Sequence, residues 1–358
     1  MNYPKIIVDM EKLSSNLDFM SSKMKENNLS FIAVTKVFSA HPEIVKLYDS
    51  KPYISYLADS RISNIINYGE TKKESLLLRI PMQSEVEDVV KHANVSFNSE
   101  VETIKLLNKA AAKLNIVHKI VLMVDLGDLR EGFFDENELY NAIAVIKGLS
   151  NIQIIGLATN LTCYGAVIPT KETLQKLVEY GAKIKETFGI ELEIISGGNS
   201  SSLHLLDIGL MPEGINNLRI GEAIVLGRET AYEQDITGMY QDVFTLEVEL
   251  VELKKKPSYP IGEMGVDAFG NKPDIKDVGE MRRGIVAIGK QDTVVDSLVP
   301  RDSRIKVIGA SSDHLILDMS KVKDEYNIGD VVQFDVGYGA LLAAFTSKYV
   351  YKKFINKK

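Results

Sequence analysis

Short apolar runs alternate with longer helical patterns along the first two thirds of the chain. Each run is rich in aliphatic or β-branched residues and is bounded by turn-forming or charged residues, as buried parallel strands are. The runs occupy residues 6–8, 31–34, 53–57, 76–80, 95–97, 120–124, 152–157, 194–195 and 218–220. About eight strand–helix alternations in ~225 residues predict an α/β fold, a (β/α)8 TIM barrel. An open, doubly wound sheet is the alternative that this pattern leaves.

Two of the intervening segments carry clear helix signals. Ser99–Glu102 has the spacing of a capping box, and apolar residues follow it at helical intervals. Between Thr170 and Phe188, apolar residues recur every three or four positions. We therefore predict one helix that starts at the capping box and another that follows Thr170.

The pattern changes after about residue 235. Residues 244–253 alternate between apolar and polar side chains, which predicts an amphipathic strand. Shorter strand-like runs separated by turn residues follow at 284–288, 304–308, 315–317 and 331–334. The sequence thus predicts a barrel over residues 1–232 and a C-terminal all-β domain over residues 233–358.

Composition and charge exclude several classes of protein. The 358 residues carry a formal net charge of −7, so the chain lacks the concentrated basic surface that nucleic-acid binding requires. No apolar run approaches the ~20 residues that span a bilayer, and the first residues do not resemble a signal peptide. The single cysteine, Cys163, excludes an intrachain disulfide and is typical of a reducing compartment. We expect a cytoplasmic protein that binds neither nucleic acid nor membrane.

The histidines give no sign of a metal centre. They lie far apart and form neither an HxH nor an HExxH motif. No metal site is predicted.

Lys36 stands directly after the apolar run at residues 31–34. In a barrel, a residue at this position points towards the mouth, where functional groups gather. Nearby apolar surface would lower the pKa of its amine and favour the neutral nucleophile that imine chemistry requires. A lysine that merely extends from a strand end into solvent fits the sequence equally well.

Two later loops have the composition of a phosphate site. Ser196–Ser202 supplies glycines and serines after an apolar run, although a flexible loop would have the same composition. Arg219 lies within an apolar run, where a charged side chain needs an anionic or acceptor partner. Gly221 would let the backbone approach a phosphate. Both loops stand where the last two βα loops of a barrel should be, and barrels recurrently bind phosphate there.

Several longer segments carry a resemblance to a known family. They are residues 124–132, 160–169, 196–202, 218–222, 265–273 and 309–314. In this order they resemble the alanine racemase superfamily of pyridoxal 5'-phosphate (PLP) enzymes of fold type III, and within it the ornithine racemase branch. Members of the superfamily pair a (β/α)8 barrel with a C-terminal β domain. The resemblance covers nearly the whole chain.

The resemblance implies roles for residues of the barrel. Lys36 matches the lysine that carries PLP as a Schiff base, and Arg219 matches the arginine that hydrogen-bonds the pyridine nitrogen. Because a guanidinium stays protonated, the ring nitrogen is left unprotonated and the carbanion is less delocalised. Arg130 matches an arginine near the phenolic oxygen of the cofactor. The other implied cofactor-binding residues are Asn160, Asn199, Ser200, Gly221 and Glu222, the last through its backbone N–H.

Four positions depart from the family pattern, and one of them, Ala40 or its neighbour, stands where a phosphate-binding tyrosine is expected. Lys290 stands where a tyrosine is expected as the second catalytic base. Asn160 replaces a histidine that stacks on the ring, and Met123 replaces a modified lysine that supports the arginine matched by Arg130. The candidates for the second base, all in the predicted β domain, are Lys290, Tyr338 and His314. Asp313 is implied as a substrate contact from the second subunit of a homodimer with shared active sites.

The sequence therefore predicts a PLP-dependent, two-base racemase whose small-molecule substrate is an amino acid, L- or D-ornithine. An alanine or broad-specificity basic amino-acid racemase is the nearest alternative. A PLP-homeostasis protein without turnover would resemble the barrel alone, and the extra β domain argues against it. An aldolase or dehydratase on the same scaffold would bring a metal site, which His314 alone does not supply.

Overall fold

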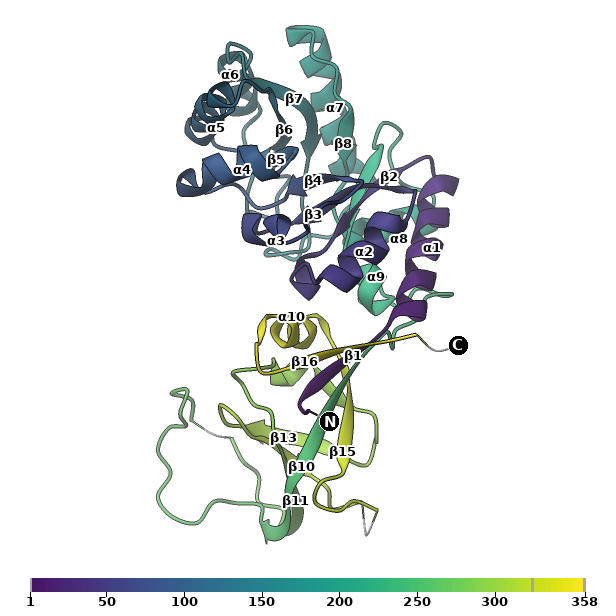
Figure 1. Ribbon diagram of the computed structural model, residues 1–358, viewed down its shortest axis with the longest axis vertical. Coiled ribbons are helices and arrows are strands. Elements are labelled where there is room, and N and C mark those ends of the chain that lie inside the picture. The colour runs from purple at the N-terminus through teal and green to yellow at the C-terminus, as the bar shows by residue number, and fades with distance from the viewer. Residues whose placement is uncertain (1, 273, 323–324, 357–358) are drawn as a thin grey trace. The chain divides into compact units, whose positions relative to one another are not determined.

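A computed structural model of the chain describes residues 2–272, 274–322 and 325–356 (Figure 1). The chain divides into two compact units. Leu13–Gln241 form the barrel unit, and Met1–Lys12 together with Asp242–Lys358 form the β unit. Pro273, the last residue of one segment that carries the resemblance, lies outside the described residues.

Eight parallel strands close into a barrel. They are β2 (Ser30–Val34), β3 (Ile54–Asp59), β4 (Glu74–Leu77), β5 (Val95–Asn98), β6 (His118–Met123), β7 (Ile152–Ala158), β8 (Ile194–Ser196) and β9 (Asn217–Ile220). The last strand pairs with the first, with Ile32 opposite Arg219, and this pairing closes the ring. The predicted TIM barrel is therefore confirmed, and the open sheet is excluded.

The barrel interior is filled by apolar side chains from alternate strand positions, as successive residues of a strand face opposite sides. Ile32, Ala58, Phe97 and Met123 belong to this buried cluster. Because side chains fill the barrel, it offers no pore, and the polar residues gather where the strands end.

Helices surround the barrel strands (Figure 1). They are α1 (Met10–Glu26), α2 (Pro42–Ser50), α3 (Ile62–Ile66), α4 (Val86–His92), α5 (Val101–Lys113), α6 (Glu136–Ile146), α7 (Lys171–Phe188), α8 (Leu203–Asp207) and α9 (Glu222–Leu226). Helix α7 follows the prediction, because the Thr170 side chain accepts a hydrogen bond from the Thr173 N–H and Gly189 ends the helix at φ 68°.

The capping box expected at Ser99 does not form. The chain stays extended through Glu100, so Glu100 is the N-cap of α5 and its side chain makes no capping hydrogen bond. Ser99 lies one residue too early to reach the first turn of the helix.

The β unit is built on an antiparallel sheet. Its strands are β10 (Phe244–Pro257), β11 (Glu280–Val286), β12 (Leu298–Pro300), β13 (Lys306–Ala310), β14 (Leu315–Asp318), β15 (Val331–Val336) and β16 (Tyr351–Ile355), with β1 (Lys5–Asp9) from the other end of the chain. The long strand β10 pairs with β15 through its first half and with β11 through its second half. The expected β domain is therefore present, and it also contains the helix α10 (Tyr338–Thr346).

The first strand of the chain corrects the expected assignment. The apolar run at residues 6–8 was counted with the barrel strands and with residues 1–232. In the structure, β1 lies in the β unit, antiparallel to β10 and parallel to β16. The division between the units also falls after Gln241 rather than after residue 232. A short buried strand has the same sequence pattern in either sheet, so only its pairing partners separate the two assignments.

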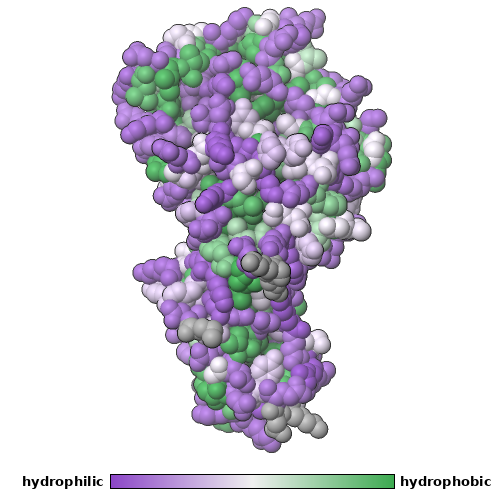
Figure 2. All heavy atoms as spheres, turned by 45° about the vertical axis from the view of Figure 1, so that its right-hand side comes forward, coloured by the Kyte–Doolittle hydropathy of each residue, from purple (hydrophilic) through white to green (hydrophobic). Residues whose placement is uncertain are grey.

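Polar and charged side chains cover most of the face of each unit that is visible in Figure 2. Among the residues that the structure describes, no helix combines the length and the apolar character needed to cross a bilayer.

Candidate active site at the barrel mouth

Lys36 lies at the carboxyl end of β2, as predicted. It is the first residue of a short 3-10 turn, Lys36–Phe38, and its side chain is half-buried. The turn ends in two residues with left-handed backbone conformations, Ser39 (φ 48°) and Ala40 (φ 53°). The amine is therefore carried by a tight, defined turn at the end of the barrel where functional groups collect.

Arg219 lies on β9, the strand next to that of Lys36. Its guanidinium donates hydrogen bonds to Ser196 Oγ (2.9 Å), the Thr159 carbonyl (2.6 Å) and Asn160 Oδ1 (3.2 Å). It also stacks 5.1 Å from the centre of the Phe97 ring. Burial lowers the pKa of Arg219 to about 10, so the side chain is still charged at neutral pH. A buried cation held by neutral oxygens is well placed to face an acceptor on a ligand.

Asn160 and Asn199 join the loops after β7 and β8. Asn199 Nδ2 donates to Asn160 Oδ1 (3.1 Å) and to the Leu161 carbonyl (2.9 Å). Asn160 Nδ2 is buried and makes no hydrogen bond to the described residues. A buried amide donor without a partner costs free energy unless a ligand satisfies it.

The two loops expected to bind phosphate lie against each other. Ser200 Oγ accepts a hydrogen bond from the Ala223 N–H at 3.2 Å, which ties the loop after β8 to the first turn of α9. Ser201 Oγ is buried and makes no hydrogen bond to the described residues. A side chain at Gly221 would place its Cβ 3.1 Å from the Val34 side chain. Gly221 therefore lets this loop pack closely on β2.

Glu222, the first residue of α9, has a largely enclosed carboxyl group. Burial raises the pKa of Glu222 to about 7, while the positive charges of Arg228 and Lys36 oppose that rise. The sequence implied only a backbone role for this residue, and the structure adds a titratable carboxyl group whose charge is felt by Lys36.

Arg130 and Glu131 form an ion pair with each other. The loop that carries them is fixed by Asp128, whose carboxylate is buried and accepts hydrogen bonds from the backbone N–H groups of Thr162 (3.0 Å) and Tyr164 (2.9 Å), among others. Burial alone would raise the pKa of Asp128, but these backbone donors bring it below its ordinary value. Asp128 thus locks the loop after β6 onto the loop after β7.

The sequence singled out Asn160 but not the other side chains and carbonyl that orient Arg219. Ser196 ends β8 and Thr159 directly follows β7, so the position of each at a strand end was a usable signal. No sequence signal marked Phe97 as a partner of Arg219, because it belongs to an ordinary apolar run. Asp128 lay within a segment that carried the resemblance, but only the fold reveals which backbone it holds.

Lys290 in the β unit lies within a second group of polar and aromatic residues. Its Nζ is 3.6 Å from Asp267 Oδ2 and 4.3 Å from the centre of the Phe269 ring. Asp267 also accepts backbone hydrogen bonds from Phe269 and Asn271, at 2.9 and 2.8 Å, which shape this loop. The loop at 265–272 thus brings a carboxylate and an aromatic ring to the lysine.

The turn that carries Asp313 and His314 packs beside Lys290. The Lys290 N–H donates to the Ser311 carbonyl at 2.9 Å. A Cβ on Gly289 would lie 2.3 to 2.4 Å from the backbone of this turn, so only glycine allows the approach. His314 Nδ1 lies 3.0 Å from Asp313 Oδ1, and both side chains are exposed. Their pairing lowers the pKa of Asp313.

Tyr338, the remaining candidate for the second base, is the first residue of α10 and is half-buried. Gly339 next to it packs closely on Val294 and Ser297, because a Cβ there would lie 3.1 to 3.3 Å from their side chains. The backbone beside Tyr338 is therefore used for packing within the β unit.

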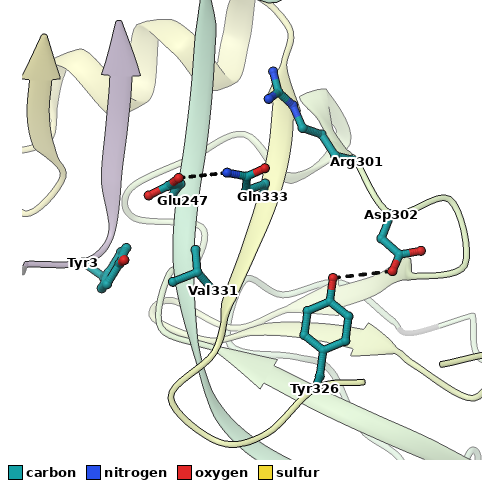
Figure 3. A pocket seen from close by; sticks show the side chains of 7 residues that line it. All are labelled: Tyr3, Glu247, Arg301, Asp302, Tyr326, Val331 and Gln333. Carbon is teal, nitrogen blue, oxygen red and sulfur yellow. Dashed lines mark hydrogen bonds between the residues drawn. The ribbon is translucent and has the colours of Figure 1, made fainter. Parts of the chain in front are cut away.

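A separate hollow on the β unit has a volume of about 410 Å³ and is shown in Figure 3. Glu247 accepts a hydrogen bond from Gln333 (2.9 Å), and Tyr326 donates one to Asp302 (3.4 Å). The charged residues that line it already form ion pairs: Glu247 with Lys5, Arg301 with Asp335 and Asp302 with Arg304. A ligand here would have to compete with these pairs.

The described residues contain no cluster of three or more histidine, cysteine or acidic side chains arranged to hold a metal ion.

Comparisons with known proteins agree with this geometry. Residues 8–229 match the family described as "Alanine racemase, N-terminal domain". The chain belongs to this family. An ornithine racemase of Acetoanaerobium sticklandii is 52% identical over 353 residues, covering 99% of this chain and all of that protein. A lysine racemase of Thermotoga maritima is 37% identical and covers 98% of both chains.

The fold also matches solved structures of the family. The crystal structure of an alanine racemase from Streptomyces lavendulae superposes with a TM-score of 0.75 at 15% identity, over 100% of this chain and 98% of that one. At this identity the match supports the fold, a barrel followed by a β domain, and the assignment of substrate depends on the closer relatives.

Proposed function

We propose that this protein is a PLP-dependent amino-acid racemase that interconverts L- and D-ornithine. The observation that supports this most strongly is that Lys36 follows β2 while Arg219 lies on the adjacent strand β9, in a chain 52% identical over 353 residues to an ornithine racemase. Ornithine and lysine, the amino acids named for the two relatives, both end in an ammonium group. A basic racemase that also accepts lysine is therefore the second candidate.

The residues at the barrel mouth fit PLP. The cofactor needs an amine, a partner for its ring nitrogen and donors for its phosphate, and this site offers them in Lys36, Arg219 and the loops at Ser200 and Gly221. The buried, unpaired polar groups Asn160 Nδ2 and Ser201 Oγ are what a site completed by a ligand would contain. Arg130, Asn199 and Glu222 complete the residues that would surround the cofactor.

The proposed mechanism uses two bases. PLP, when bound, supplies the electron-accepting ring that makes the Cα proton of an amino acid removable. Lys36 holds the cofactor through Nζ and serves one face of Cα as acid or base. Lys290 Nζ serves the opposite face, so a proton leaves from one side and another arrives on the other. Arg219, which stays protonated, would donate to the ring nitrogen of bound cofactor and leave that nitrogen unprotonated.

The β unit would act in the site of a second subunit. We include in the proposal a homodimer in which Lys290, with Asp313 as a substrate contact, reaches the barrel mouth of its partner. Lys290 is the first candidate because it stands where the family's second base is expected, and the ion pair with Asp267 and the contact with Phe269 give its side chain a defined position; His314 and Tyr338 are the alternatives. A cytoplasmic location completes the proposal.

A substrate panel tests this function. Purified protein with PLP is mixed with single enantiomers of ornithine, lysine, alanine and arginine, and the loss of optical activity is followed. We expect ornithine to be turned over fastest, with lysine next. Fast turnover of alanine without turnover of ornithine would contradict the proposal. The Lys36→Ala variant should lose both turnover and the visible absorbance of lysine-bound cofactor.

A further inference from the structure

A buried hydrogen-bond network lies next to Lys36, on residues that the racemase mechanism does not use. Thr35, which directly precedes Lys36, is fully buried. Its Oγ1 lies 2.7 Å from Asp59 Oδ2 and 2.8 Å from the Tyr68 hydroxyl. Asp59 is the last residue of β3 and Tyr68 follows α3. Three separate segments of the barrel unit therefore meet at the residue before the lysine.

The hydrogen bonds have one consistent direction. Asp59 Oδ1 accepts from the Arg61 N–H and from Asn64 Nδ2, both at 3.0 Å. The Thr35 hydroxyl has a single proton, for which Asp59 Oδ2 at 2.7 Å is a nearer and more strongly accepting partner than the Ala58 carbonyl at 3.2 Å, so Tyr68 donates its own proton to Thr35. Burial raises the pKa of Tyr68 well above its ordinary value, which keeps the phenol protonated. Burial also raises the pKa of Asp59, and its hydrogen bonds with Thr35 and Asn64 oppose that rise.

The network stands outside the barrel interior. Ala58, next to Asp59 on β3, faces the apolar cluster inside the barrel. Because neighbouring strand residues face opposite sides, Asp59 points to the helix side of the wall. A group on that side acts on chemistry at the barrel mouth only through the backbone it holds.

The backbone of Thr35 is fixed as firmly as its side chain. Its N–H donates to the Ala58 carbonyl at 2.8 Å, and its carbonyl accepts from the Ala40 N–H at 3.2 Å. The second bond closes the turn that contains Lys36. The network thus holds the base of a side chain with four rotatable bonds, whose reach is decided by the position of its Cα.

We propose that Asp59 and Tyr68 are positioning residues for Lys36 and act through the Thr35 hydroxyl. This inference rests on the proposed function, in which Lys36 Nζ holds the cofactor. The network sets how readily the amine reaches an aldehyde bound at the barrel mouth.

Matched variants at Thr35 test the inference. Thr35→Val keeps the shape of the side chain and removes the hydroxyl, whereas Thr35→Ser keeps the hydroxyl. Apoprotein is titrated with PLP, and the lysine-bound fraction is measured by visible absorbance and by borohydride trapping followed by mass spectrometry at Lys36. We expect Thr35→Val to bind PLP through Lys36 at least about tenfold more weakly than the wild type. Thr35→Ser should stay within about threefold of the wild type, because its hydroxyl keeps the hydrogen bond to the Asp59 carboxylate.

Two further variants keep the test decisive. Ser96→Ala disturbs another buried network of the same barrel, in which Ser96 bonds Asn98 and His118, and it should lower stability without weakening the lysine linkage. If Thr35→Val does not fold, Tyr68→Phe replaces it, with an expected loss of about threefold because only the outer hydrogen bond is removed.

Three outcomes are distinguishable. Weaker linkage in Thr35→Val, or in Tyr68→Phe where it replaces that variant, supports the inference when Ser96→Ala links normally. The inference is overturned if Thr35→Val, or Tyr68→Phe in its place, links PLP to Lys36 as well as the wild type does. It is also overturned if Ser96→Ala loses as much of the linkage. Either result leaves the proposed function intact. If the wild-type protein itself forms no linkage at Lys36, the proposed function fails, and the inference fails with it.

Discussion

His118 is a buried imidazole at the start of β6, with its Nε2 2.8 Å from Ser96 Oγ. Burial lowers the pKa of His118 to about 4, whereas an unfolded histidine titrates near ~6.5. The unfolded chain therefore binds this proton more readily. The contribution of His118 to stability is complete above pH ~6.5 and is lost as the pH falls towards 4, on the order of 3 kcal/mol. Denaturant unfolding at a series of pH values measures this loss.

The His118→Gln variant is the comparison for that prediction. It should be less stable at pH 7 and should lose less stability than the wild type between pH 6.5 and 4. Glu222 titrates in the opposite sense, because burial raises its pKa to about 7 and so costs stability as the pH rises. Both proteins share that effect, and the difference between them isolates His118. Parallel stability curves would show that the imidazole is not responsible.

The site residues that could be predicted from the sequence are those that their position near a strand end is enough to place at the barrel mouth. Lys36 and Ser200 follow apolar runs and Arg219 lies within a short one near its end, and parallel strands bring such positions to one end of a barrel. The contact of Thr35 with Asp59 and Tyr68 depends instead on the register between β2 and β3. No pattern within either segment encodes that register.

Among the elements, the loop after β6 and the loop after β7 are joined by one carboxylate. Asp128 accepts backbone hydrogen bonds from Thr162, Cys163, Tyr164 and Val167. In an Asp128→Asn variant, the amide NH2 group would face these N–H donors, and the loop after β6 should separate from the loop after β7. We expect a loss of about 2 to 3 kcal/mol in unfolding free energy and faster hydrogen exchange at the four amides.

Asp125→Asn is the matched control for Asp128→Asn. Asp125 accepts hydrogen bonds only from Gly127 and Leu129 of its own loop among the bonds that the structure records. Its replacement should leave exchange at Thr162 and Tyr164 unchanged. Equal acceleration in both variants would mean that the loops separate without regard to Asp128.

The elements of the fold were predictable where one segment carries its own signal. The period-two pattern of 244–253 identified β10, and the apolar spacing after Thr170 identified α7. The run at residues 6–8 failed because a short buried strand does not encode its partners. Ser99 failed as a cap because the chain stays extended through Glu100, which makes Glu100 the N-cap of α5.

For the whole molecule, a shared active site predicts complementation between inactive variants. Lys36→Ala and Lys290→Ala should each have little activity. Mixed under conditions that exchange subunits, they should form heterodimers in which one site has both lysines, so about one quarter of the wild-type activity returns. Racemization of ornithine measures the recovery. No recovery, with subunit exchange verified by mass, would place both lysines on one chain or remove Lys290 from the reaction.

The strand β1 also has a consequence for how the protein is made. It leaves the ribosome before the barrel strands, yet its partners β10 and β16 follow the whole barrel in the sequence. At translation speeds of about 5 to 20 residues per second, roughly 240 residues separate its appearance from that of β10, a delay of some 12 to 50 seconds. During that time the whole barrel can fold, while Lys5–Asp9 has no strand to pair with. A nascent chain stalled before β10 should therefore expose this apolar segment to chaperones.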